Sequence, residues 1–202
     1  MTRPTVPPRL ASLPGREPPA DLGADLARLA RLPASARERL WEALGPSLSE
    51  PLPASVEGLL DAFCAAHGAG GDELARALKA CRFLIREASR VDLPREAFVE
   101  DLARLGAPGE VQSALAAGYE RGKAFVRAEM VRAALVDHGK LLLSAGYRVD
   151  TIHASADARG LQAPVVLLTL RYQEGKAEGQ LTLQVLPETL RQLRALCDQI
   201  LG

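Results

Sequence analysis

Apolar residues recur with two different periods along this chain. Up to about Leu143 they return every three or four positions, which is the spacing of one face of an α-helix. From Tyr147 onward they alternate as on a β-strand, until Pro187 opens a last helical stretch. The pattern predicts an α+β fold: an all-helical N-terminal domain, then a small three-stranded antiparallel sheet with a C-terminal helix.

Six helices are predicted before the sheet, each with an apolar stripe. Ser35 and Asp72 are the expected N-caps of the second and fourth helices, and Gly45-Pro46 is expected to end the second. The predicted ranges are 21–30, 35–44, 55–67, about 72–89, a helix that Pro94 opens, and one from Pro108 to Leu135 or beyond.

Two glycines, Gly118 and Gly122, lie inside the sixth predicted helix. Each costs about 1 kcal/mol relative to alanine in a helix interior. Their four-residue spacing puts them on the same side of the helix, where another backbone could approach closely. The alternative is a mild bend of the helix.

The three predicted strands cannot close a core by themselves. They span 147–153, 165–172 and 181–185, with a polar stretch between the first two. One face of the second strand carries Val166, Leu168, Leu170 and Tyr172, and the other carries Val165 and Leu167. The terminal helix can cover one face with a stripe of Leu190, Leu193, Cys197 and Ile200. The N-terminal helices or a second copy of the chain would have to cover the other, so the pattern favours assembly over catalysis.

Composition and charge exclude some functions. The chain has 202 residues, is 48% hydrophobic and has a formal net charge of zero. This balance argues against nucleic-acid binding, which usually needs a basic face. No apolar run long enough to span a bilayer and no signal peptide is found, so no membrane insertion is expected. Three widely spaced cysteines predict buried thiols in a reducing cytoplasm. The bias towards Ala, Arg, Leu and Gly suggests a bacterial genome.

The chain is expected to have three parts. Residues 1–20 contain six prolines and are predicted to form a disordered tail, either solvated or recognised by an aromatic groove. The helical domain is predicted over 21–137 and the sheet with its helix over 140–202.

No catalytic or cofactor motif is found. The Gly-x-Ser-x-Gly, P-loop and dinucleotide-binding patterns are all missing, and Glu100 and Asp101 are expected on a solvated helix face. Cys64 and His67 are two metal-capable side chains on one helix, but a closed site needs three or four ligands. The other candidates lie on different predicted elements: Cys81, His138, His153 and Cys197. No enzyme activity, metal or cofactor is therefore expected.

Arg148 and Asp150 point to the same face of the first predicted strand. They could fix the register between two units of this kind, since an arginine on a strand often pairs across an interface. Alternatively, they are edge-strand charges that discourage aggregation.

The stretch from Leu141 to Ile200 resembles a COMM domain. It opens with Tyr147-Arg148-Val149-Asp150, close to the family's Trp-Arg-x-Asp, and continues with Pro164-Val165, an alternating Leu strand and a Leu-rich helix. Residues 77–88, 93–102 and 105–106 are similar to the helical N-terminal domain of these proteins. The resemblance covers roughly residues 25 to 202 and departs at Tyr147, where the family usually has Trp.

The resemblance implies a non-catalytic adaptor that self-associates. COMM domains pair, each contributing its sheet and helix to a shared core, so the expected partner is the chain itself, as a homodimer or higher oligomer, or another COMM-like chain. The expected interface residues are Tyr147, Arg148, Val149, Asp150, Val166, Leu168, Leu170, Leu181, Leu183, Val185, Leu190, Leu193 and Ile200. The alternative is a protein that binds a metal or a small ligand in its helical domain. A DNA-associated regulator is disfavoured by the neutral charge.

Overall fold

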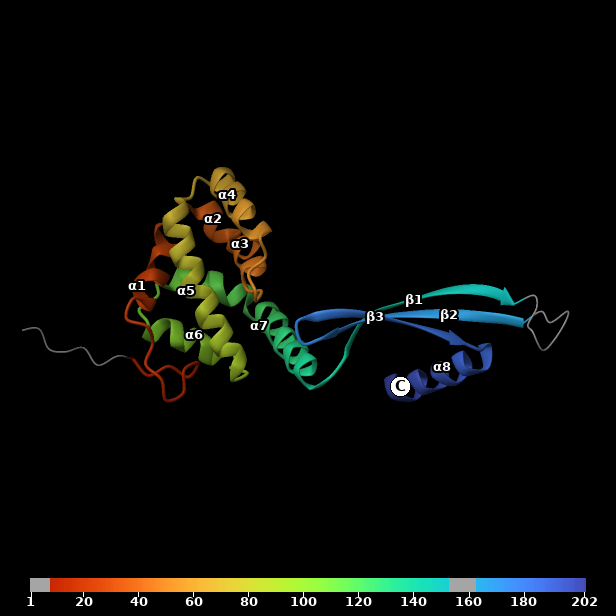
Figure 1. The fold of residues 1–202 in the computed structure, drawn as a ribbon. Coiled ribbons are helices and arrows are strands. Elements are labelled where there is room, and N and C mark those ends of the chain that lie inside the picture. The colour runs from red at the N-terminus through yellow and green to blue at the C-terminus, as the bar shows by residue number, and fades with distance from the viewer. Residues whose placement is uncertain (1–7, 153–162) are drawn as a thin grey trace, which may run out of the picture. The chain divides into compact units, whose positions relative to one another are not determined.

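The computed structural model describes residues 8–152 and 163–202 (Figure 1). The chain splits into two compact units, Met1–Met130 and Val131–Gly202. The predicted α+β fold is confirmed, because helices precede a three-stranded antiparallel sheet of order β1-β2-β3 and a C-terminal helix follows it. The elements are α1 (Leu22–Ala27), η1 (Arg28–Arg31), α2 (Ala34–Glu38), α3 (Leu40–Ser47), α4 (Ser55–His67), α5 (Gly71–Arg90), α6 (Arg95–Arg104), α7 (Gly109–His138), β1 (Leu141–Ile152), β2 (Ala163–Glu174), β3 (Ala177–Val185) and α8 (Pro187–Leu201).

Helix α5 is the centre of the first unit. It contacts α1, η1, α3 and α4, of which α1, α3 and α4 are labelled around it in Figure 1. Its buried residues recur at helical spacing because one broad stripe of the helix faces the core. They include Leu74, Ala77, Leu78, Cys81, Leu84, Ile85 and Ala88.

Helices α6 and α7 join this core through a stacked aromatic pair. The rings of Phe98 and Tyr119 lie parallel with their centroids 4.0 Å apart, and both side chains are fully buried. The Tyr119 hydroxyl donates a hydrogen bond to the Leu93 carbonyl oxygen at 2.8 Å. Burial, followed by the nearby Glu120, raises the pKa of Tyr119, so the hydroxyl keeps the proton that it donates.

The expectation of a disordered tail is wrong for residues 8–20, while residues 1–7 lie outside the described part of the chain. Leu10 and Leu13 are buried in the helical core. The backbone N–H groups of Ala11 and Ser12 donate to the two carboxylate oxygens of Asp101 at 2.9 and 2.7 Å. Prolines prevent a helix here, but the side chains of two leucines and one carboxylate acceptor still anchor the segment.

Trp41 explains the two glycines of α7. A Cβ atom on Gly118 would lie 2.4 Å from the indole ring of Trp41, and one on Gly122 would lie 2.8 Å from it. The indole Nε1 donates to the Ala114 carbonyl oxygen at 2.9 Å. The close approach predicted at these glycines is therefore made by an aromatic side chain rather than by another backbone.

Several predicted helix ends differ from the structure. Neither Ser35 nor Asp72 caps a helix: the N-cap positions of α2 and α5 are Pro33 and Gly70, and no described side chain caps either helix. Pro46 lies inside α3, which ends at Ser47. Local capping patterns were outweighed by the packing of the buried stripes, which sets where each helix runs.

The change from helix to strand comes earlier than predicted. Helix α7 ends at His138 and β1 begins at Leu141, although the periodicity placed Leu143 in the helical part. The third strand also begins earlier than the predicted 181–185, because Gly179 lies in β3 opposite Tyr172, and a Cβ on it would lie 2.5 Å from the Tyr172 ring. His153, which was predicted to end the first strand, and the polar stretch after it up to residue 162 lie outside the described residues.

Candidate functional site

The sheet of the second unit has one strongly apolar face. Cross-strand partners lie on the same face, and the register pairs Tyr147 with Leu168 and then Leu168 with Leu183. The pairing of Val149, Val166 and Val185 and that of Leu170 with Leu181 extend this face in both directions. Eight of the predicted interface residues thus lie together: Tyr147, Val149, Val166, Leu168, Leu170, Leu181, Leu183 and Val185.

Much of this apolar face is open to solvent. Tyr147 is 78% exposed and Val149 is 57% exposed, and Leu181 and Leu183 are exposed on the third strand. Only Val166 and Val185, at one end of the face, are buried. A large apolar surface of this kind marks an interaction site far more often than an inert surface.

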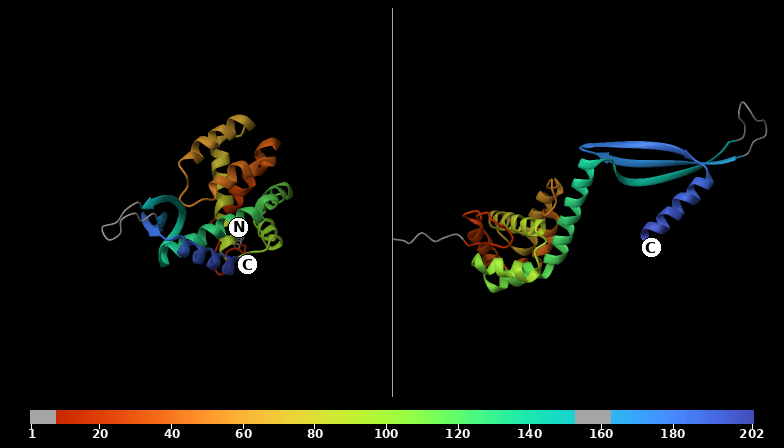
Figure 2. Two further views of the ribbon diagram at one scale, coloured as in Figure 1. Left: turned by 90° about the vertical axis from the view of Figure 1, so that its right-hand side faces the viewer. Right: turned by 90° about the horizontal axis from the view of Figure 1, so that it is seen from below.

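Helix α8 leaves its own apolar stripe uncovered. It contacts the sheet at β2, beginning just beyond the end of β3 (Figure 1; Figure 2, right). The structure describes all of its residues and none is buried. Of the three predicted interface residues on this helix, Leu193 and Ile200 are exposed and Leu190 is half-buried. The expectation that α8 covers one face of the sheet is therefore wrong for the single chain.

Arg148 and Asp150 lie on the opposite, more polar face. The Arg148 Nη2 atom lies 2.8 Å from Asp150 Oδ2, and both side chains remain substantially exposed. Their cross-strand neighbours are Leu167 and Val165. The structure thus separates this pair from the eight residues of the apolar face, and β1 is an edge strand on which such charges are common.

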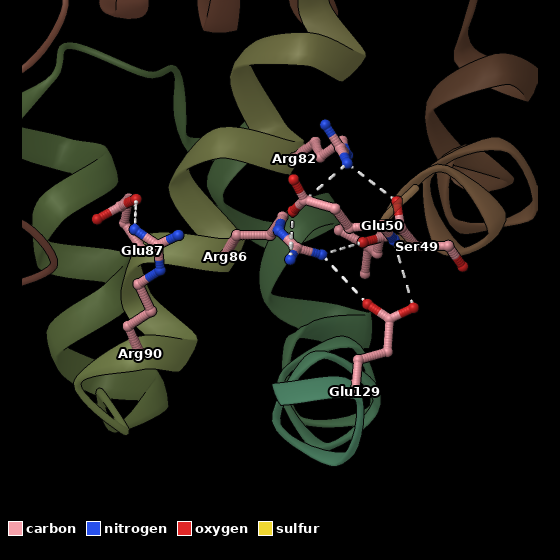
Figure 3. Close-up of polar contacts among 8 residues, drawn as sticks. Ser49, Glu50, Arg82, Arg86, Glu87, Arg90 and Glu129 are labelled. Carbon is pink, nitrogen blue, oxygen red and sulfur yellow. Dashed lines mark hydrogen bonds and ion pairs between the residues drawn. The ribbon is translucent and has the colours of Figure 1, made fainter. Parts of the chain in front are cut away.

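A cluster of charged groups in the helical unit surrounds Arg86 (Figure 3). Arg86 of α5 lies 2.5 Å from Glu50 and 3.2 Å from Glu129 of α7, and it donates to the Leu48 carbonyl oxygen at 2.6 Å. Arg82, one turn earlier, donates to the Ser49 carbonyl oxygen at 2.9 Å. Each arginine thus binds the segment that follows α3, which makes the cluster a structural clamp rather than an acid–base pair.

The metal-capable side chains that the structure describes form no group of three. Within the described residues, no three His, Cys, Asp or Glu side chains gather at a spacing suited to a metal ion. The His67 ring instead packs at 4.6 Å from the buried Phe63 ring. The cysteines are free thiols, and the expectation that all three are buried fails for Cys197, which is exposed on α8, and in part for Cys64.

Cys81 is expected to be inert in the native protein. Burial raises the pKa of its thiol to about 12, so the reactive thiolate is almost absent near neutral pH. In a Cys64→Ser, Cys197→Ser variant, a thiol reagent should modify no cysteine of the folded chain over an hour and one cysteine per chain in denaturant. Rapid modification of the folded variant would contradict the buried position of Cys81.

The position of Asp101 differs most clearly from its prediction. The sequence predicts it on a solvated helix face, yet its side chain is fully buried. It follows Phe98 by three residues and precedes Leu102, so it lies on the apolar stripe of α6. A carboxylate on an apolar helix stripe indicates a buried acceptor, which needs hydrogen-bond donors as partners. Here the backbone N–H groups of Ala11 and Ser12 are these donors.

Among the described ranges, no helix is both long and apolar enough to cross a bilayer.

The chain matches no curated protein significantly. The family model described as the COMMD2-7/10 HN domain matches residues 16–119, which include α1 to α6 and the first part of α7. This match covers half of the chain and leaves the sheet and α8 outside it. The helices up to Tyr119 agree with this match to a helical domain, and the chain belongs to the COMM domain protein family.

Proposed function

We propose that the chain is a non-catalytic adaptor that self-associates through the apolar face of its sheet and the stripe of α8. COMM domain proteins are associated with protein–protein interaction, and they are not a known enzyme family. The observation that carries the proposal is the distribution of exposed apolar side chains. Among the described residues, sixteen large hydrophobic side chains are exposed, and thirteen of these lie in Val131–Gly202.

A second copy of the chain is a suitable cover for this surface. Burying apolar area is worth about 25 cal/mol per Å², and obligate dimers bury roughly 2,000 Å² or more in total. The apolar face and the α8 stripe together offer an extended surface on each copy. A twofold axis would place the same residues of both copies against each other, so one patch can serve as both sides of the interface.

The mass of the full chain in solution tests this proposal. Light scattering after size exclusion should give at least twice the mass of one chain at micromolar concentration. The mass should hold when salt is raised, because apolar burial is not screened by ions. A single-chain mass at tens of micromolar would reject self-association as the function of this surface.

A further inference from the structure

The helical unit contains a concave groove that the proposed self-association does not use. It has a volume of about 500 Å³ and lies between the region of α3 and α4 and the middle of α7. Apolar side chains make most of its wall, among them Trp41, Val56 and the half-exposed Phe125. Ligand sites in proteins are typically clefts of about 300–1,000 Å³ with mostly apolar walls and a few polar groups.

The floor of the groove depends on the glycines of α7. Because Gly118 and Gly122 have no side chains, the indole of Trp41 can lie directly on the helix. Its single polar atom, Nε1, is bonded to the Ala114 carbonyl oxygen. Trp41 therefore presents apolar ring surface to the groove, with no polar group in need of a partner.

The wall opposite α7 is fixed by the arginine clamp of α5 (Figure 3). Leu48 and Ser49 both line the groove. Their carbonyl oxygens accept hydrogen bonds from Arg86 and Arg82 at 2.6 and 2.9 Å, respectively. The clamp thus holds this wall in place and satisfies its backbone acceptors, which favours a preformed apolar site.

The only charged residue on the lining is Arg121. Its side chain is exposed and has no ion pair with any described residue. The neighbouring acid Glu120 pairs instead with Lys123, at 3.2 Å. An unpaired guanidinium beside an apolar groove complements an anion, because charge-assisted hydrogen bonds to a carboxylate are strong and directional.

We infer that this groove binds a small amphipathic acid, a molecule with an apolar aliphatic body and one carboxylate. The body lies against Trp41 and Phe125, and the carboxylate pairs with Arg121. The size of the cavity suits a small molecule. This site lies entirely within the helical unit, so it is independent of the sheet surface and adds ligand binding to the proposed adaptor role.

Trp41 is the only tryptophan of the chain, so its fluorescence reports directly on the groove. Titrating the full-length protein with decanoate should give a saturable change in Trp41 emission. The Arg121→Ala variant should bind decanoate about threefold to fivefold more weakly, the effect of losing one ion pair at an exposed arginine. Decanol, which has the same body without the charge, should bind wild type and variant equally.

The matched control is Arg76→Ala, which removes an exposed arginine on α5 that also has no ion pair with a described residue. It should leave the affinity for decanoate unchanged. A linear or absent response of Trp41 to decanoate would overturn the inference and leave the groove to a protein segment or to solvent. Equal binding of decanoate by wild type and Arg121→Ala would overturn it too, because the anion would then have no partner here.

Discussion

Replacing Leu183 by glutamate is expected to convert the self-associated protein into single chains. Leu183 lies in β3 on the apolar face, paired with Leu168 of the central strand. A carboxylate at this position would be buried without a partner when two faces meet, which costs several kcal/mol. A symmetric interface contains the position twice, so the dissociation constant should rise by at least about a hundredfold.

Light scattering of the full chain measures this change, and Gln184→Glu is its control. Gln184 is the next residue of the same strand and lies on the opposite face, paired with Leu167. The control introduces the same charge into the same edge strand and should retain the mass of the wild type. Circular dichroism of both variants checks that the fold is kept. An unchanged mass for Leu183→Glu would show that the apolar face is not the interface.

The composition of this face could be predicted because it depends only on local geometry. Side chains alternate across a strand, so the spacing of Val166, Leu168 and Leu170 already placed them on one face. For the same reason, the helical spacing of apolar residues predicted the first and last residues of α4 and α5 nearly to the residue. Both the sheet face and the helix bounds depend only on residues that are a few positions apart in the sequence.

Features that depend on distant residues could not be predicted in this way. Trp41 and Ala114 are 73 positions apart, so the sequence shows two glycines in α7 but not the ring that fills their space. The position of α8 is equally non-local. The apolar stripe of α8 predicts that another apolar surface packs against it. The spacing of Leu193 and Ile200 does not show whether that surface belongs to the same chain or to a second one.

The N-terminal segment shows how a compositional rule fails. Six prolines in residues 1–20 indicate disorder, since they remove backbone donors and prevent helices. Two leucines and two backbone N–H groups still fix residues 10–13, because Asp101 provides acceptors 89 and 90 positions away. The free energy of these hydrogen bonds and buried leucines outweighs the tendency of a proline-rich segment to remain disordered.

The Asp101→Ala variant is therefore expected to lose about 2–4 kcal/mol of unfolding free energy, since it strands one buried and one partly buried backbone donor. It also removes the ion pair with Arg104, whose Nη1 atom lies 3.3 Å from Asp101 Oδ1. Urea unfolding followed by the fluorescence of Trp41 measures the loss. Without the hydrogen bonds to Asp101, the N-terminal segment should detach and become sensitive to protease before the rest of the helical unit does.

Glu100→Ala separates the buried anchor from the surface charge. Glu100 is the adjacent residue and also pairs with Arg104, at 3.2 Å, but its side chain is 65% exposed. An exposed pair of this kind contributes less than about 1 kcal/mol, so this variant should unfold almost as the wild type does. Asp101→Asn keeps one acceptor oxygen and should fall between the two. Equal stability of Asp101→Ala and Glu100→Ala would show that the carboxylate of Asp101 does not hold the N-terminal segment, and that Leu10 and Leu13 alone fix it to the core.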